Sequence, residues 1–498
     1  MDRHDVTCSR RGILKGASAL AASVAVGGWP AWATEQSTPS TIAPAAHPDI
    51  TGQLSTYMSL AGDRDLPPEV EAKAKQHILD TLTAMVSGAN LLPAQTAVKF
   101  ARAYGGEPVA TVVGTNIVCG PIEAALANGV QAHSDETDDS HSPSHSHPGC
   151  ATVSAALAAG EKFGISGARF IRAVTLGYDV GPRVTMTLGG LQYQMDTHRS
   201  DHSIANTFAA CAAAASAAGL SAQQMRWVLD YAAQQASGIA AWQRDTQHVE
   251  KALVFGGFPA RNGLTTALLI HLGATGVDDI FFGSDNFFAA FGPQADPSGL
   301  VDKLGERYEI ARTNLKKWTV GSPIQAPLDA LQVIMKQRPF KLDDVRNVTV
   351  RMAGSEAKTV NNRDMPDICL QHMIAVMLVK GTVTFATAHD RDLMQDPTIL
   401  AERAKVELVP DAELEKLYPQ LVAVVEVTLK DGGHYSQRVD AVRGTVHNPM
   451  TNEEVTEKAK DLMTPFLGES QTGQLIDAIL RLETMDDLRK LRPLLQRS

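Results

Sequence analysis

The stretch from His133 to Gly149 reads HSDETDDSHSPSHSHPG and lies between two alanine-rich segments of helical periodicity. It holds four of the fifteen histidines, three aspartates and one glutamate, and it contains no Lys or Arg. Burying so many polar groups is costly, and a simple linker does not need them. We therefore predict a loop of acids and bases held between two rigid helices, which is a common way to build a catalytic site. We call residues 133–149 the reactive loop.

The segments on both sides of the reactive loop have helical periodicity, with apolar residues at three- and four-residue spacing. Aromatic residues make up only 5% of the chain and alanines are abundant, which favours close-packed helices. The small side chains of 204–218 indicate that another helix lies very near this segment. We predict an all-helical domain over 49–313. Its clearest helices are 72–85, 122–130, 151–163, 204–218, 225–235 and 264–272.

The pattern changes after Asn314. Alternating apolar and polar residues predict half-buried strands, and Lys430-Asp431-Gly432-Gly433 predicts a hairpin turn. We expect an α+β lid domain over 314–446, followed by C-terminal helices over 447–498 that return to the helical domain. The fold class is thus mainly α, with a substrate cleft expected between the two domains. The predicted elements are strands 346–352, 422–429 and 434–439, and helices 371–378, 451–463 and 472–481.

The N-terminus has the features of an export signal. Arg10 and Arg11 precede a weakly apolar run, 16–29, which is too short to span a bilayer. Ala31-Trp32-Ala33 offers the small residues that a signal peptidase reads. We predict a twin-arginine signal peptide over 1–33 and a flexible leader over 34–48. The twin-arginine export machinery is then an expected partner, and the mature chain is periplasmic or secreted and free of the membrane. An uncleaved membrane anchor is the alternative.

Charge and cysteine content exclude other classes of protein. The net charge of −10 at pH 7, without long basic runs, argues against nucleic-acid binding. Removal of the signal would leave Cys119, Cys150, Cys211 and Cys369, whose wide spacing predicts neither a paired metal motif nor a disulfide framework.

Taken alone, the reactive loop allows three interpretations. Histidines that titrate near neutral pH, next to carboxylates, suit general acid–base catalysis. Imidazole and carboxylate also suit zinc, iron or manganese, although no H-E-x-x-H spacing or cysteine partner is present. A solvated polar loop is the third interpretation, and all three remain open at this point. The residues concerned are His133, His141, His145 and His147 with Asp138 and Asp139.

The reactive loop resembles the motif of the MmgE/PrpD family, which includes 2-methylcitrate dehydratase, cis-aconitate decarboxylase and iminodisuccinate epimerase. Residues 133–140 match the family's His-x-x-Asp-Phe-Asp-Asp-Thr stretch, His141 follows directly, and His147-Pro148-Gly149 matches the His-Pro that comes after the stretch. Roughly residues 50 to 490 can be laid along the family. Further matching segments are Lys316-Lys317-Trp318, Arg443-Gly444 and Asn448-Pro449-Met450.

The resemblance implies roles for residues of the loop. His147 corresponds to the catalytic histidine that gives or takes a proton at a substrate carbon. Glu136 stands at the place of the family's first aspartate and reaches one methylene further. Asp138 and Asp139 match the aspartate pair, of which one orients a histidine and the other braces the loop. Ser140 stands in place of a hydroxyl-bearing threonine.

The resemblance also implies groups outside the loop. A second active-site histidine precedes the small-residue helix, and either His198 or His202 could fill this role. Lys251 and Lys316 resemble the two lysines that bind substrate carboxylates. Arg244 is a further candidate for carboxylate binding, which could instead pair with its acidic neighbour in the sequence.

The implied activity is that of a lyase, most simply a hydro-lyase of the 2-methylcitrate dehydratase type. It would remove a proton next to a carboxylate of a small di- or tricarboxylate. Epimerisation, isomerisation or decarboxylation on the same scaffold is the first alternative. A periplasmic solute- or metal-binding protein without turnover is the second. The resemblance implies no cofactor, no metal, a small anionic carboxylate as substrate and a homodimer.

Overall fold

Helices with small side chains form the centre of the structure, a computed structural model that describes residues 48–497. Helix α8 (Asp201–Ala217) is buried along its length and packs against α5 (Pro148–Phe163), α6 (Gly167–Leu188) and α11 (Phe258–His271). The contact with α6 leaves no room for a side chain at Gly181, where an added Cβ would lie 2.3 Å from the carbonyl oxygen of Ala205. The expectation that a helix lies very near the alanine-rich segment is therefore confirmed.

Other helices surround this centre, together with one short hairpin. The hairpin consists of β1 (Ala110–Thr111) and β2 (Val118–Cys119), which pair antiparallel. It departs from the all-helical pattern expected here, because strands of this length are too short to show alternation in the sequence. The surrounding helices are α1 (Ile50–Leu60), α2 (Pro68–Gly88), α3 (Leu92–Tyr104), α4 (Pro121–Ala132), α7 (Leu191–Thr197), α9 (Ala222–Gln235), α10 (Val249–Ala252) and α12 (Phe287–Phe291).

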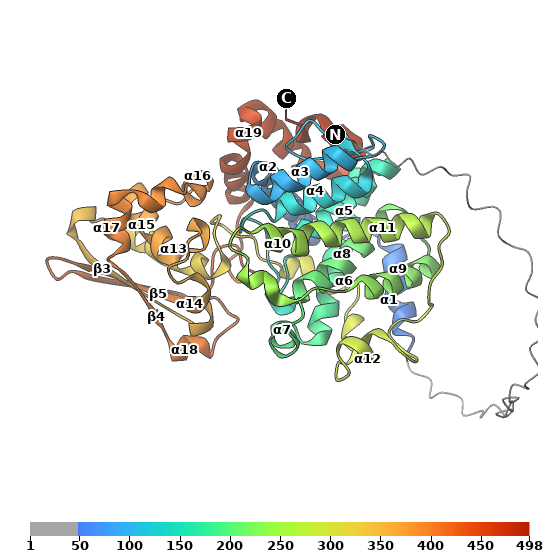
Figure 1. The fold of residues 1–498 in the computed structure, drawn as a ribbon, viewed down its shortest axis with the longest axis horizontal. Coiled ribbons are helices and arrows are strands. Elements are labelled where there is room, and N and C mark those ends of the chain that lie inside the picture. Colours follow the sequence, from blue (N-terminus) through green and yellow to red (C-terminus); the bar gives the residue numbers. More distant parts are fainter. Residues whose placement is uncertain (1–47, 498) are drawn as a thin grey trace, which may run out of the picture. The chain divides into compact units, whose positions relative to one another are not determined.

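A four-stranded sheet lies in the smaller α+β part, with strand order β4-β3-β5-β6 (Figure 1). Strand β5 (Ala423–Leu429) pairs antiparallel with β3 (Val345–Met352) and with β6 (His434–Val439), and its pairing with β6 is the hairpin that the turn predicted. Strand β4 (Val406–Pro410) pairs parallel with β3 and was not predicted. All five of its residues are at least partly exposed, so no buried alternation marks it in the sequence.

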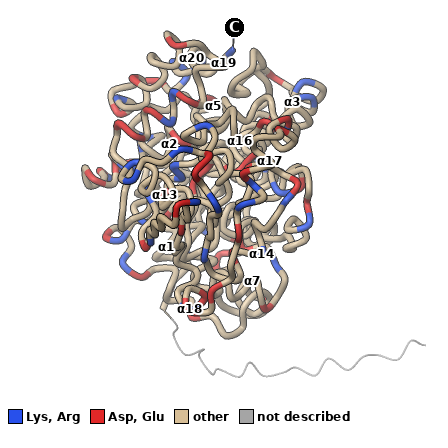
Figure 2. The backbone as a smooth tube through the Cα atoms, turned by 90° about the vertical axis from the view of Figure 1, so that its left-hand side faces the viewer, with Lys and Arg blue, Asp and Glu red and all other residues tan. Residues whose placement is uncertain are grey.

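The helices of the α+β part pack on this sheet and build a second hydrophobic core, separate from that of the helical part. The fold is therefore mainly α with a smaller α+β part, as expected. Acidic and basic residues are interspersed on the side of the molecule that carries α13, α16 and α17 (Figure 2). The helices are α13 (Ser322–Gln337), α14 (Gly354–Val360), α15 (Leu370–Lys380), α16 (Phe385–His389), α17 (Pro397–Arg403) and α18 (Ala412–Glu415).

The C-terminal residues rejoin the helical part. Helix α19 (Asn452–Leu480) packs along α2 (Figure 1), and α20 (Arg492–Leu495) follows it. Both helices predicted here are present within α19, and Gly468, whose φ of 76° is not helical, separates them by a kink. Apolar residues of α19 and α20 belong to the larger core.

Two helices begin earlier than their apolar patterns predict. Helix α5 starts at Pro148, because proline is favoured at the first helical position. Helix α8 starts at Asp201, because the hydroxyl of Ser200 accepts a hydrogen bond from the backbone of Ser203 and caps the helix. As a result His147 directly precedes α5, and His202 lies in the first turn of α8.

Across residues 48–497, no helix combines the length and the apolar character needed to cross a membrane. The predicted signal peptide and nearly all of the predicted leader lie outside the described residues.

Candidate functional site

The reactive loop connects the end of α4 to the start of α5 and contains an internal backbone bridge. His133 caps the C-terminus of α4, and His147 stands before the first residue of α5. His141 and Ser146 form an antiparallel bridge around a 3₁₀ turn at Ser142–Ser144. Most of the loop is buried, so its many acids and bases must find partners within the protein.

Asp139 anchors the loop to three helices. Its Oδ2 atom lies 2.9 Å from Nδ1 of His77 and accepts a 2.5 Å hydrogen bond from the hydroxyl of Tyr178. Its Oδ1 atom accepts a 3.1 Å hydrogen bond from the backbone of Gly149. Burial and the charge of Asp139 raise the pKa of Tyr178 well above its usual value, so the hydroxyl remains a donor. Asp139 thus braces the loop.

His147 is held in one tautomer. Its Nδ1 atom lies 2.6 Å from the carbonyl oxygen of Asp139 and 3.5 Å from Oδ1 of Asp138, and since a carbonyl only accepts, Nδ1 carries the proton. Burial lowers the pKa of His147, so the ring is neutral near pH 7 and Nε2 keeps a free lone pair. Burial alone would raise the pKa of Asp138, but His133, at 2.9 Å, and His147 lower it further than burial raises it. The Asp138 carboxylate therefore stays ionised between two imidazoles.

The structure brings His202, not His198, to His147. The rings of His202 and His147 are stacked with centroids 5.3 Å apart, and Phe255 lies against both rings. Nδ1 of His202 lies 2.9 Å from Oδ1 of Asp201, and burial places its pKa well below 6.5. His198 is exposed at the C-terminal end of α7, with a left-handed φ of 60°. Two neutral imidazoles thus face each other.

Lys251 and Lys316 meet at the side chain of Glu136, and we call these three residues the lysine cradle. Lys251 contacts Oε1 of Glu136, while Nζ of Lys316 lies 3.3 Å from Oε2 and donates a 2.9 Å hydrogen bond to the backbone carbonyl of Glu136. Burial disfavours charge on Glu136, but the two lysines hold its pKa well below the usual value. Burial would lower the pKa of Lys316, and Glu136 raises it instead. Glu136 and Lys316 are therefore both charged.

The two remaining candidates differ in their placement. Ser140 exchanges backbone hydrogen bonds of 3.0 and 2.8 Å with Asn314, which ties the loop to the segment that carries Lys316. Ser140 thus connects these two segments through its backbone atoms. Arg244 is exposed on a 3₁₀ turn, and no contact links it to the lysine cradle or to His147.

A π-helical turn at Leu253–Gly257 aims Phe255 at the histidines and follows directly on α10, which carries Lys251. The turn lies against α4 so closely that an added Cβ on Gly256 would be 1.9 Å from the carbonyl oxygen of Gly129. Such π-helical turns are rare and are often found at functional sites. Gly256 and Gly257 are thus needed for close packing against α4 rather than for chemistry.

His248 is a member of the site that the sequence analysis missed. It is buried, its Nδ1 atom lies 3.9 Å from Oε1 of Glu136, and its ring centroid is 5.2 Å from that of His133. Burial, followed by the charge of Lys251, puts its pKa well below 6.5, so His248 is neutral. Its position three residues before Lys251, almost one helical turn, was the available signal.

The α+β part and α19 also reach the reactive loop. Nε2 of His389, in α16, lies 2.9 Å from Oδ2 of Asp135 and 4.0 Å from Oδ2 of Asp367. Nζ of Lys458, in α19, donates a 2.6 Å hydrogen bond to Asp80 and a 2.9 Å hydrogen bond to the carbonyl of Thr137. These residues lie hundreds of positions from the loop, and no spacing in the sequence indicates the contacts.

We expect the His389–Asp135 ion pair to make stability depend on pH. Burial opposes the charge on His389, but Asp135 raises its pKa from 6.5 to about 9. The ion pair stabilises the fold fully below pH 6.5, and this stabilisation is lost as the pH rises through 9. The difference between the two pKa values corresponds to a contribution of about 3 kcal/mol to the free energy of unfolding. Between these pH values the free energy of unfolding should fall more steeply for the wild type than for His389→Gln. Urea unfolding followed by circular dichroism at several pH values measures this difference.

The exposed His447 offers a control, because His447→Gln should keep the wild-type pH dependence. Asp367 acts in the same direction but at lower pH, because burial raises its pKa from 3.8 to about 7 and its contribution to stability falls between these two pH values. Parallel curves for the wild type and His389→Gln between pH 6.5 and 9 would refute the prediction.

Among the described residues, two groups of three could hold a metal ion. One is His133, Asp138 and His147, and the other is His145, Asp201 and His202. His141, a ligand candidate from the sequence, belongs to neither. Its Nδ1 atom lies 2.8 Å from Oγ of Ser144 and its Nε2 atom 3.3 Å from Glu309.

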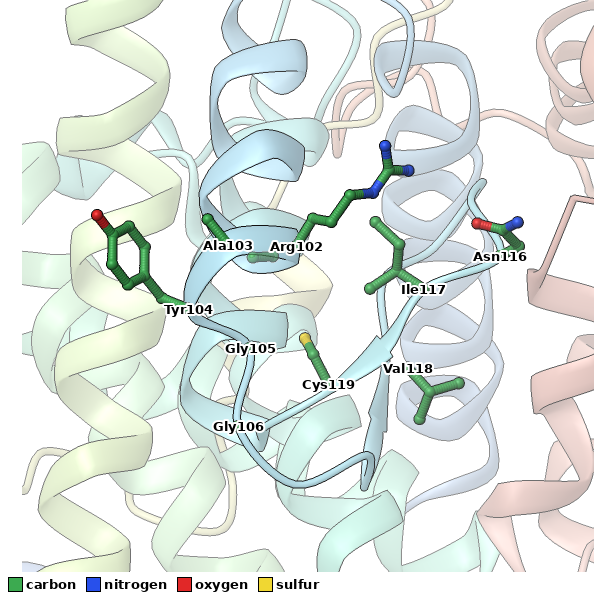
Figure 3. A pocket seen from close by; sticks show the side chains of 10 residues that line it. Arg102, Ala103, Tyr104, Gly105, Gly106, Asn116, Ile117, Val118 and Cys119 are labelled. Carbon is green, nitrogen blue, oxygen red and sulfur yellow. The ribbon is translucent and has the colours of Figure 1, made fainter.

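A cavity of about 630 Å³ lies away from this site, between the end of α3 and the β1–β2 hairpin, where Arg102, Tyr104 and Cys119 line it (Figure 3). Cys119 lies just before the start of α4 and His133 follows its end. The two ends of α4 are about 18 Å apart, because the helix has 12 residues and each adds about 1.5 Å. The substrate cleft expected between the two parts does not coincide with this cavity. Where the helical part meets the α+β part, the side chain of Glu136 contacts Lys251 and Lys316.

Comparisons with known proteins cover nearly the whole described chain. The family model of the MmgE/PrpD N-terminal domain matches residues 52–299, and that of the C-terminal domain matches residues 318–484. The cis-aconitate decarboxylase-like protein oryM of Aspergillus oryzae is 26% identical over 479 residues, which cover 90% of this chain and 97% of the relative. Human cis-aconitate decarboxylase is 26% identical over 479 residues, covering 90% of this chain and 94% of the relative. The 2-methylcitrate dehydratase-like protein oryR of Aspergillus oryzae is 27% identical over 169 residues, covering 31% of this chain and 34% of the relative.

Proposed function

Because this chain belongs to the MmgE/PrpD family, we propose that it is a lyase that needs no cofactor and acts on a small di- or tricarboxylate. The two relatives that match along most of their length are named as a decarboxylase and a decarboxylase-like protein, and a relative that matches over a third of its length is named as dehydratase-like. Decarboxylation and dehydration both pass through negative charge on a carbon near a carboxylate. We propose that the site stabilises this negative charge, whichever of the two reactions follows.

The observation that carries the proposal is the lysine cradle. Two ammonium groups converge on one carboxylate in a largely buried place, and charge-assisted hydrogen bonds of this kind are among the strongest in proteins. Glu136 shows with its own side chain that the lysines accommodate a carboxylate. A substrate carboxylate that takes this place would lie beside cations where negative charge grows in the transition state.

The imidazole pair supplies proton transfer. His147 presents the lone pair of Nε2, which suits removal of a proton from carbon. The aci-carboxylate that forms is stabilised by Lys251 and Lys316, and the amide groups at the start of α5 add favourable potential. In a dehydration, a second group donates a proton to the leaving hydroxyl, and His202 can be that group once the anionic substrate has raised its pKa and the ring has taken up a proton.

Decarboxylation uses the same groups in a different order. The electron pair of the broken C–C bond moves into the remaining unsaturated acid as carbon dioxide leaves, and a proton then adds to carbon. An anionic substrate next to His147 favours the charged imidazolium and raises its pKa, so this histidine can deliver the proton. The decarboxylase and decarboxylase-like relatives that match along most of their length favour this outcome, whereas the neutral ring of His147 favours removal of a proton from carbon, the first step of a dehydration.

The test is to incubate the purified chain with cis-aconitate and with 2-methylcitrate in deuterated water. Release of carbon dioxide identifies a decarboxylase, and loss of water identifies a dehydratase. Deuterium that enters next to a carboxylate without loss of either group identifies an epimerase or isomerase. Binding of these acids without any exchange or turnover would overturn the lyase and support a solute-binding protein.

We also propose that the chain is exported through the twin-arginine route and acts as a homodimer outside the cytoplasm. The sequence Ser9-Arg10-Arg11-Gly12 supports export, and the family resemblance supports the dimer. Replacing both arginines with lysine should leave the uncleaved chain in the cytoplasm, while export at the wild-type level would contradict the route. Sedimentation of the mature chain as a monomer at micromolar concentration would contradict the dimer.

A further inference from the structure

His145, Asp201 and His202 form a compact cluster of groups that can bind metal. Nδ1 of His145 lies 2.8 Å from Oδ2 of Asp201, and Nδ1 of His202 lies 2.9 Å from Oδ1 of the same carboxylate. The two imidazole rings meet edge to face with centroids 4.5 Å apart. One ligand atom of each residue lies within 4.8 Å of those of the other two. The proton transfer proposed above uses His202 from this cluster, and it leaves His145 without a role.

The residue types of the cluster suit a metal ion, because zinc and related ions bind carboxylate oxygen and imidazole nitrogen. An imidazole that binds through Nδ1 carries its proton on Nε2, which changes the tautomer and not the charge.

The distances require little rearrangement. In a tetrahedral zinc site with bonds of about 2.0–2.2 Å, neighbouring ligand atoms are about 3.3–3.5 Å apart. The nitrogen–oxygen distances in the cluster are 2.8 and 2.9 Å, so opening them by well under 1 Å would admit the ion. Three protein ligands leave the fourth position for water.

The backbone at His145 presents this side chain to the cluster and to solvent. His145 has a left-handed φ of 50°, a strained conformation for histidine, and the His141–Ser146 bridge encloses it. Its side chain is 27% exposed, which gives an ion access to the buried Asp201 and His202. In the second group of three the most exposed side chain is that of His147, at 10%, so access to that group is narrower.

We propose that His145, Asp201 and His202 bind a divalent transition-metal ion of the zinc class, and that the bound ion inhibits the enzyme. Binding follows from the cluster alone. Inhibition rests on the proposed function, because the ion would hold His202 away from its partner His147 and from substrate. The metal-binding interpretation of the reactive loop thus has a defined place, with His145 as a ligand and His141 outside it.

Binding is tested on the full chain after treatment with a chelator. Calorimetric titration with Zn²⁺ should show one site, and Co²⁺ should give the visible absorption of a tetrahedral ion with nitrogen and oxygen ligands. His145→Ala and Asp201→Asn should weaken binding by more than the roughly 10–100-fold that loss of an outer hydrogen bond costs. His198→Ala removes an exposed histidine close in sequence and should bind as the wild type does.

Equal Zn²⁺ affinity in the wild type and His145→Ala would overturn the site. So would loss of binding in His147→Asn with full binding in His145→Ala, because the ion would then sit between His133, Asp138 and His147. Circular dichroism of each variant separates loss of a ligand from loss of the fold.

Inhibition is tested separately, with the substrate that the turnover assay identifies. Zn²⁺ should inhibit the wild type at the concentration at which it binds, and His145→Ala should keep basal turnover and resist inhibition. Equal inhibition of both chains would refute the inhibitory role. If no acid is turned over, the proposed lyase fails, while the calorimetric result still decides the metal site.

Discussion

His147→Asn should lower kcat by about 100-fold to 10,000-fold, the usual contribution of a general acid–base group. Asparagine can still donate from its side-chain nitrogen to the carbonyl of Asp139, as Nδ1 of His147 does over 2.6 Å. The loop should therefore keep its shape while the Nε2 lone pair is lost. Steady-state kinetics measures kcat, and circular dichroism checks that the helices remain.

The matched control is His198→Asn, which changes an exposed histidine outside the cluster. It should retain wild-type kcat and KM. Turnover by His147→Asn at a rate near that of the wild type would remove His147 from the chemical step and leave His202 as the candidate base.

Lys251→Met should reduce kcat/KM by about 100-fold or more, similar to the loss of one group that stabilises an oxyanion. Methionine keeps much of the length of the side chain and its packing near Trp242 and Phe255, whose ring centroids lie 5.7 and 5.5 Å from the ammonium group. The charge that pairs with Glu136, and by our proposal with substrate, is lost. The measurement is kcat/KM together with the affinity for a polycarboxylate inhibitor that is not turned over.

Lys317→Met provides the control on a neighbouring lysine of the same type. Nζ of Lys317 lies 3.3 Å from Asp329 and 2.7 Å from Gln332, and it contacts no member of the lysine cradle. Its loss should leave kcat/KM unchanged. Similar values of kcat/KM for both variants would show that Lys251 does not bind the reacting carboxylate.

The sequence predicted the helical part, the hairpin of β5 and β6 and the importance of the reactive loop, because periodicity and composition are local properties. It also placed Glu136 and Lys316 in one site through the family resemblance, although 180 positions separate them. It could not decide between His198 and His202. That choice depends on where α8 begins, and the cap at Ser200 rather than the apolar pattern determines the start.

Other features had no local signal at all. His389 meets Asp135 only because the α+β part folds against the loop, and Lys458 reaches Asp80 only because α19 returns along α2. The edge strand β4 is too exposed to alternate. Tertiary contacts of this kind follow from how the elements pack, which a single sequence does not show.

Lys251 and Lys316 already bind a carboxylate of the protein itself, that of Glu136. An acid with a single carboxylate can only exchange with Glu136, so the number of ion pairs is the same before and after and little affinity results. By our proposal, an acid with two or three carboxylates would replace Glu136 and still have anionic groups left for the start of α5 and for the histidines. We therefore expect competition with Glu136 to favour such acids over monocarboxylates at the binding step, before any bond is broken.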